Sequence, residues 1–202
     1  RLSPSTTSPA ETLDKLGQGR ARLSRLITQM LQLSRLEHFD VSTLQQPIDW
    51  TEIVGETFTE VLPLAERRQV ELACEWPDGG AAPLPLHGVA ALVAALLRNL
   101  LDNALRYSAA GGQVVVRFAA DSLDVLDSGP GVPPEHLARL GDRFYRPAGL
   151  AESGSGLGLS IVRRIAALHG LSVEWGPRAD GPGFQVRLQR GSSTPGNALH
   201  PV

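Results

Sequence analysis

Apolar residues recur at helical spacing through the first part of the chain. Leu16, Leu23, Ile27 and Met30 follow one another at steps of seven, four and three positions, and further leucines widen the stripe. That spacing predicts one long amphipathic helix within residues 10–40. Its apolar face is larger than a lone helix leaves in water, so we expect a dimerisation helix or, alternatively, a helix that folds back on the following domain.

From residue 46 onward, strand-like alternation and helix-like periodicity follow each other without strict order. Such mixing favours an α+β fold in which a sheet and a layer of helices form a two-layer sandwich. We expect Thr51 to cap the first helix of this domain. The predicted strands cover residues 46–50, 70–76, 113–119, 122–126, 172–175 and 184–188, and the predicted helices cover 51–68, 88–107, 134–140 and 157–169.

The two ends of the chain differ in composition from the segment between them. Residues 1–9 and 191–202 are polar and carry Ser, Pro and Gly, so we expect loops or disorder there. The sequence therefore predicts a helix at residues 10–40 that precedes one domain at residues 47–190.

Charge and composition exclude several classes of function. Lys plus Arg number 19 against 21 Asp plus Glu, so no basic field is available to hold a nucleic acid or an anionic membrane. Cys74 is the single cysteine and cannot close an intrachain disulfide. No apolar run reaches the roughly 20 residues that a membrane-spanning helix needs, and no secretory signal pattern opens the chain.

A polar stripe interrupts the otherwise apolar helix predicted at residues 88–107. Asn99, Asp102, Asn103 and Arg106 recur every three to four positions and therefore share one side of that helix. Amide oxygens suit a hydrated Mg²⁺, and a guanidinium suits phosphate. An ordinary solvent-exposed face would give the same pattern, so this segment alone leaves both interpretations open.

Two glycine-containing segments follow. Asp127-Ser-Gly-Pro-Gly131 places a carboxylate at a strand end, where it could accept from an exocyclic amine, although a plain turn has the same composition. Gly154-Ser-Gly-Leu-Gly158 runs into a predicted helix, so its N–H groups could bind phosphate. The spacing of these glycines matches neither the Rossmann motif nor the P-loop.

Between the two glycine segments, residues 142–147 precede a short stretch at residues 148–153 that we expect to be flexible. Arg143 and Arg146 suit a lid that closes over phosphates. We expect Phe144 to anchor the base of that lid in the core, with contact to a nucleotide as the alternative.

The order of these segments resembles the N, G1, F and G2 boxes of sensor histidine kinases, and the helix ending Gln32-Leu-Ser-Arg-Leu-Glu37 resembles the second helix of that family's dimerisation and phosphotransfer hairpin. The resemblance implies the Bergerat-type ATP-binding sandwich, with ATP and Mg²⁺ as cofactors. It also implies a homodimer that forms through the hairpin and a response-regulator partner. The short lid resembles those of kinases paired with OmpR-like, winged-helix regulators.

The resemblance implies a role for each matching position. Asn103 would bind Mg²⁺, with Asn99 one turn earlier, and Arg106 would contact phosphate. Asp127 would accept from the adenine amino group. The remaining nucleotide-binding positions carried over from the family, including pocket, lid and phosphate-cradle residues, are Tyr107, Gly129, Gly131, Phe144, Gly154, Gly156, Leu157 and Gly158. Arg143 and Arg146 join Asn99 and Arg106 as the expected catalytic residues.

The family's phosphoacceptor motif, His-Glu-x-x-x-Pro, does not occur at any of the five histidines. We therefore expect a C-terminal part of a longer inner-membrane sensor, with the acceptor helix and the membrane segment upstream and this part in the cytoplasm. A gyrase- or Hsp90-type ATPase would carry Glu in place of Asn99 as its base. A non-catalytic nucleotide-binding or dimerisation module remains an alternative, whereas the long Leu-rich helix argues against an anti-sigma-factor kinase.

Overall fold

The computed structural model describes residues 46–147 and 154–191, together with residues 20, 27, 29–31, 34 and 36. The last seven of these have helical backbone, which agrees with the helix predicted there. The segments predicted as loops at 1–9 and 191–202, apart from residue 191, and the stretch at 148–153 lie outside the described residues. Within the described part, no helix combines the length and apolar character needed to cross a membrane.

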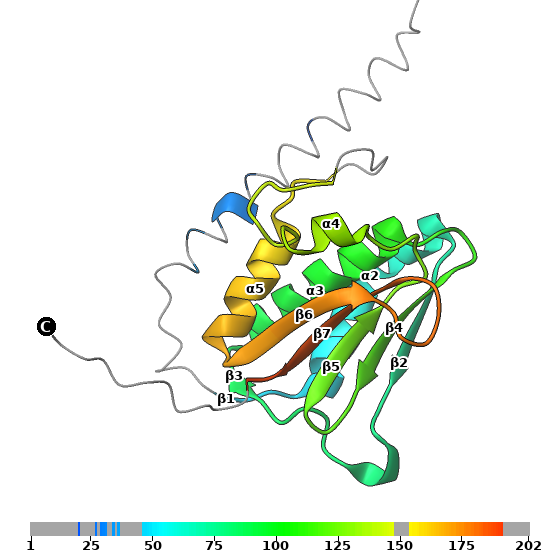
Figure 1. The fold of residues 1–202 in the computed structure, drawn as a ribbon. Helices are drawn as coiled ribbons and strands as arrows, with labels where there is room; N and C mark the ends of the chain where they lie inside the picture. Colours follow the sequence, from blue (N-terminus) through cyan, green and yellow to red (C-terminus); the bar gives the residue numbers. More distant parts are fainter. Residues whose placement is uncertain are drawn as a thin grey trace, which may run out of the picture.

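A five-stranded mixed sheet and a layer of helices form the two-layer α+β sandwich that the sequence predicts (Figure 1). The strand order is β2-β4-β5-β7-β6, in which β2 and β4 are parallel and the other neighbours are antiparallel. The helices are α2 (Trp50–Arg68), α3 (Ala90–Tyr107), α4 (Pro134–Leu137) and α5 (Gly158–Leu168). The sheet strands are β2 (Glu71–Glu75), β4 (Gln113–Phe118), β5 (Ser122–Leu126), β6 (Leu171–Pro177) and β7 (Phe184–Arg190).

Two very short strands lie outside this sheet. β1 (Gln46–Pro47) pairs antiparallel with β3 (His87–Gly88), and a 3-10 turn, η1 (Asp78–Gly80), lies between β2 and β3. The sequence predicted β1 as a longer edge strand and did not predict β3.

Two helix ends differ from the prediction. Asp49, not Thr51, is the N-cap of α2, because its carboxylate accepts from the backbone N–H of Thr51 and of Glu52. The helix predicted at 134–140 ends as α4 at Leu137. The N–H of Leu140 contacts both the Leu137 and His136 carbonyls at 3.2 Å, so the chain tightens into turns there.

The core lies between the sheet and the helices α2, α3 and α5. Leu97, Leu101 and Leu105 recur every fourth position along α3 and are fully buried. Ile161 and Ile165 of α5 are buried in the same core. Because these faces are apolar, the polar stripe of α3 lies off the core face, in the C-terminal half of the helix.

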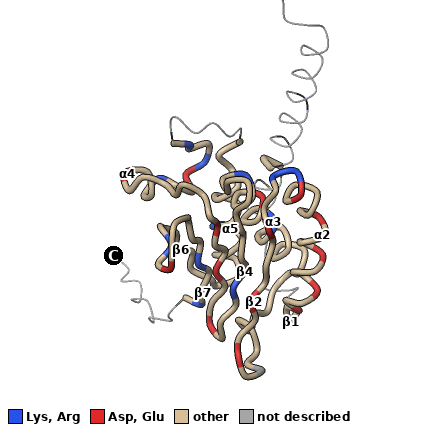
Figure 2. The backbone as a smooth tube through the Cα atoms, turned by 90° about the vertical axis from the view of Figure 1, so that its right-hand side faces the viewer, with Lys and Arg blue, Asp and Glu red and all other residues tan. Residues whose placement is uncertain are grey.

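The opposite face of the sheet carries a cross-strand ladder of alternating charge. In the strand register, Glu75 of β2 lies opposite Arg117 of β4, and Arg117 lies opposite Asp124 of β5. Asp124 lies opposite Arg187 of β7, and Arg187 lies opposite Glu174 of β6. Opposite charges on neighbouring strands stabilise such a face. Around the whole described backbone, acidic and basic positions are intermixed (Figure 2).

Candidate functional site

A cavity opens at the end of the sandwich where α3 meets the end of β5. Figures 1 and 2 both place α4 at this end. The polar residues and glycines in its wall are Gln29, Asn99, Asp102, Asn103, Arg106, Tyr107, Asp127, Gly131, Gly141, Tyr145, Arg146, Gly154, Ser155, Gly156 and Gly158. Segments separated by more than 50 positions in the sequence thus meet at one place.

The amide side chains of α3 face the start of α5. Asn99 donates through Nδ2 to the Ala95 carbonyl at 2.7 Å, which leaves its Oδ1 directed toward Gly158. A Cβ on Gly158 would lie 3.2 Å from Asn103 Nδ2 and 3.6 Å from Asn99 Oδ1. Glycine at this position therefore keeps a small space between the two amides and the first turn of α5.

Arg106 forms a two-point ion pair with Asp102, which lies one helical turn earlier on α3. Its Nε and Nη2 donate to the two Asp102 oxygens at 2.8 and 2.9 Å. Both side chains line the cavity, and that of Arg106 is only 15% exposed. Arg106 is therefore held at the cavity wall, where its charge is partly compensated by Asp102.

Asp127 is buried at the end of β5, with a well-defined orientation. Its Oδ1 accepts from the backbone N–H of Gly129 at 2.8 Å and of Phe184 at 3.1 Å. Within the part of the chain that the structure describes, Oδ2 has no hydrogen-bond partner. Burial raises the pKa of this carboxyl, while the two N–H donors and the nearby Arg178 oppose that rise. One acceptor oxygen thus remains available beside the cavity.

The turn after Asp127 requires glycine for steric reasons. A Cβ on Gly129 would lie 2.5 Å from the Tyr107 carbonyl oxygen, so the turn packs directly on the end of α3. Gly131 has φ +75° and lines the cavity wall. This glycine turn therefore joins Asp127 to Tyr107.

The segment from Gly154 to Gly158 forms the opposite wall. Arg146 donates to the Gly154 carbonyl at 3.2 Å, and Ser155 Oγ accepts from the Leu157 N–H at 3.1 Å. Leu157, the N-cap of α5, is fully buried and provides no side-chain cap. Among the described residues, no capping side chain therefore occupies the N–H groups at the start of α5.

The structure contradicts one expectation about the lid base. Phe144 is 57% exposed and does not line the cavity, so it is not a core anchor. Its φ of +64° and the hydrogen bond from its N–H to the Gly156 carbonyl fix its backbone, while its side chain is exposed. Arg143, Gly129 and Leu157 also lie outside the cavity wall, the last as a buried core residue.

Several wall residues were not predicted from the sequence. Tyr145 lines the cavity, and its hydroxyl lies 2.7 Å from His136 Nδ1. Phe184 contributes from the first position of β7. Gln29, from the N-terminal helical segment, accepts from Ser155 Oγ at 2.6 Å. Tyr145 lies within a recognised motif. Phe184 and Gln29 do not, and they reach the cavity through tertiary contacts that no local motif indicates.

Other reactive groups in the described residues offer no second centre. Burial, then the charge of Glu75, raises the pKa of the Cys74 thiol to about 11, so this thiol is protonated at neutral pH. No cluster of three or more His, Cys, Asp or Glu side chains suited to a metal occurs in the part of the chain that the structure describes. Any cation at this site would therefore need other oxygen ligands.

The chain matches a family model described as "Histidine kinase-, DNA gyrase B-, and HSP90-like ATPase" over residues 88–193. It is 41% identical over 178 residues to the sensor protein QseC of Escherichia coli (strain K12), an alignment that covers 88% of this chain and 39% of QseC. The chain thus spans about two-fifths of the length of that relative.

Two solved structures show the same fold. The structure of the cytoplasmic segment of histidine kinase QseC has a TM-score of 0.59 and 30% identity, and the match covers 84% of this chain and 93% of that one. Full-length ShkA in complex with AMPPNP has a TM-score of 0.73 and 23% identity, and the match covers 93% of this chain and 40% of that one.

Proposed function

The chain belongs to the histidine kinase, DNA gyrase B and HSP90-like ATPase family, in its sensor histidine kinase branch, and on that premise we propose that it binds Mg²⁺-ATP and supplies the γ-phosphate for transfer to a histidine. One observation carries the proposal: Asn99, Asn103, Asp127 and the segment at 154–158 meet at a single cavity.

In this proposal, each element has a role toward ATP. Asp127 Oδ2 accepts from the adenine amino group, since its Oδ1 is already occupied by two N–H donors. The N–H groups at the start of α5 bind phosphate oxygens, which the positive end of the helix dipole favours. Arg146 lies beside Gly154 and adds positive charge at the same wall. The presence of AMPPNP in the ShkA structure, which shares the fold, supports a nucleotide as ligand.

The donor set also fits Mg²⁺. Magnesium prefers oxygen ligands in octahedral geometry and keeps several waters. The amide of Asn103 makes no hydrogen bond within the described residues, and the space that a Cβ on Gly158 would fill lies next to it. We propose that Asn103 Oδ1 holds the ion together with ATP phosphates, and that Asn99 supports it from one turn earlier. Bound Mg²⁺ would neutralise phosphate charge during transfer.

Asn99 favours phosphotransfer over hydrolysis. A carboxylate at this position could activate a water molecule, but a neutral amide is a poor base. Asn99 also donates its N–H to Ala95, which orients its oxygen toward the cavity. The attacking group in this proposal is therefore an imidazole and not water.

The proposal extends to partners and location. We propose that the acceptor histidine lies on a dimerisation hairpin whose second helix includes Ile27, Met30 and Leu31, each more than 50% exposed here. From that histidine the phosphoryl group would pass to an aspartate of an OmpR-like response regulator. The whole protein would be a homodimeric inner-membrane sensor with this part in the cytoplasm.

Phosphotransfer to a separate hairpin tests the proposal. The 202-residue chain is mixed with Mg²⁺, γ-³²P-labelled ATP and a separately supplied dimerisation hairpin that carries His-Glu-x-x-x-Pro. We expect acid-labile, base-stable label on the hairpin and none on the chain alone. Label that is absent from the hairpin, while ATP is hydrolysed in solution, would instead favour a gyrase-like ATPase.

A further inference from the structure

Asp127 is held by the hairpin between β6 and β7 as well as by its own turn. The Asp127 N–H donates to the Phe184 carbonyl at 2.9 Å, and Phe184 N–H donates back to Asp127 Oδ1 at 3.1 Å. The carboxylate therefore accepts from the Phe184 N–H, a donor that a backbone carbonyl would accept from if the β5–β7 ladder continued. Any movement at the start of β7 would also move this carboxylate.

Arg178, in the turn between β6 and β7, completes this contact. Its Nη1 donates to the Asp127 carbonyl oxygen at 3.3 Å, and its Nε donates to Asp180 Oδ1 at 2.9 Å. The side chain is only 15% exposed, and it does not line the cavity. A planar guanidinium serves two partners in fixed directions, which a lysine ammonium on a flexible stem does not reproduce.

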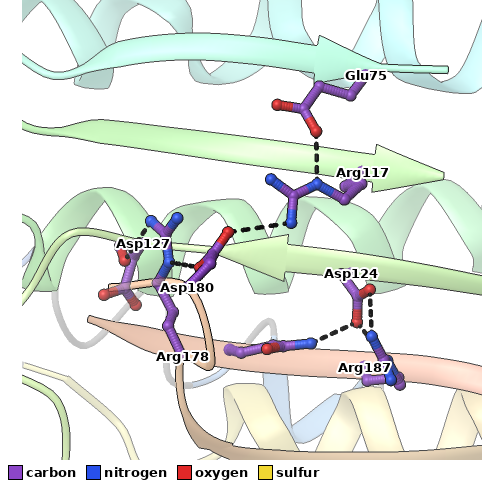
Figure 3. A network of polar contacts seen from close by, with 8 residues as sticks. Glu75, Arg117, Asp124, Asp127, Arg178, Asp180 and Arg187 are labelled. Carbon is purple, nitrogen blue, oxygen red and sulfur yellow. Dashed lines mark hydrogen bonds and ion pairs between the residues drawn. The ribbon is translucent and has the colours of Figure 1, made fainter. Parts of the chain in front are cut away.

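The contact extends onto the outer face of the sheet (Figure 3). Asp180 Oδ2 pairs with Arg117 Nη1 at 3.2 Å, and Arg117 in turn binds Glu75. A line of alternating charge thus runs from β2 across β4 to the turn and ends at Asp127. Arg187 and Asp124 form a separate pair on the same face.

The backbone of the turn approaches Asp127 closely. A Cβ on Gly183 would lie 1.9 Å from the Asp127 carbonyl oxygen and 2.9 Å from Arg178 Cδ. The Arg178 N–H also donates to the Gly183 carbonyl at 3.2 Å. Arg178 and the Asp127 main chain are therefore packed against each other with no room for a side chain between them.

We propose that Arg178, fixed by Asp180, is a positioning residue that holds Asp127 in the orientation that recognises the adenine amino group. This inference rests on the proposed nucleotide site and adds a determinant of base specificity from outside the cavity. Without Arg178, the Asp127 carbonyl oxygen loses a donor, and the orientation of the carboxylate depends on the Gly129 and Phe184 N–H groups alone. Recognition of the amine should weaken more than binding of the phosphates.

The test compares ATP with inosine triphosphate, which carries a carbonyl where adenine carries its amine. Calorimetric affinities of the 202-residue chain are measured for both nucleotides, in the wild type and in Arg178→Gln. We expect the ATP-to-ITP affinity ratio to fall about fivefold in the variant, which corresponds to one ordinary hydrogen bond. A general loss of structure would lower both affinities by the same factor.

Three further variants complete the test. Asp180→Asn changes an exposed position and should lower the ratio by a smaller factor. If Arg178→Gln does not fold, Asp180→Asn takes its place in the test. Arg178→Lys should restore only part of the ratio. Arg187→Gln removes the neighbouring ion pair and should leave the ratio unchanged. A wild-type ratio in both Arg178→Gln and Asp180→Asn would overturn the inference, whereas a wild-type chain that does not bind ATP would overturn the proposed function itself.

Discussion

Asp127 combines a buried charge with two fixed N–H donors. Burial raises its pKa, so the folded protein holds this proton to higher pH than the unfolded chain does. The contribution of such a group to stability is fully present below the unfolded pKa and is lost as the pH rises through the folded pKa. Retaining an ionised carboxylate here therefore costs stability at neutral pH, which is expected where the charge serves binding.

We expect Asp127→Asn to gain stability relative to the wild type as the pH is raised from about 3 to about 7, because asparagine cannot ionise. Urea unfolding across that range measures the difference. Asp180→Asn should show the opposite trend, since Arg178 and Arg117 lower the pKa of Asp180 to about 2. A pH-independent difference for Asp127→Asn would contradict the account of its burial.

At the scale of elements, long periodic segments were predictable from the sequence and contact-dependent ones were not. α2 and α3 begin and end close to their predicted limits because their apolar periodicity runs over most of their length. β3 exists only because the chain returns to pair with β1, which no local pattern encodes. In the same way, Asp127 was predictable from its own motif, whereas Arg178 reaches it from a turn with no motif.

Gly156 tests how the segment at 154–158 is built. Its φ is +71°, and a Cβ would lie 2.7 Å from the main-chain carbon of Phe144. Gly156→Ala should therefore cost more than the roughly 1–2 kcal/mol of left-handed backbone strain and should also weaken ATP binding. Urea unfolding and calorimetry measure both effects.

Gly170→Ala is the matched control. Gly170 has a similar φ of +68°, but a Cβ there would meet no atom within 4 Å among the described residues. It should show the strain cost alone, with unchanged ATP affinity. Equal costs for the two variants would contradict the close approach of Gly156 to Phe144.

At the scale of the whole molecule, the N-terminal helical segment contacts the sandwich and also exposes an apolar face. Leu36 is 2% exposed in the core, and its carbonyl accepts from Arg164 at 3.0 and 3.1 Å. Leu31 is 55% exposed. The sequence left two alternatives for this helix, folding back on the domain or dimerisation. One helix can do both, since one side contacts the domain and another side is exposed.

Leu36→Ala should lower the free energy of unfolding by about 2–5 kcal/mol, as expected for a large-to-small change in a core. Leu31→Ala should change it by less than about 0.5 kcal/mol and should instead weaken self-association. Urea unfolding and sedimentation separate these effects. A stability loss as large at Leu31 as at Leu36 would show that the apolar face packs on the domain.

Binding of Mg²⁺ and the ATP analogue AMPPNP tests the central claim most directly. Calorimetric titration of the wild-type chain should show one site, and Asp127→Asn should reduce its affinity at least about tenfold, because a charge-assisted hydrogen bond to the base is lost. Asp124→Asn, a buried carboxylate on the outer face of the same strand, should retain wild-type affinity. Wild-type affinity in Asp127→Asn, or no binding by the wild-type chain, would contradict the account.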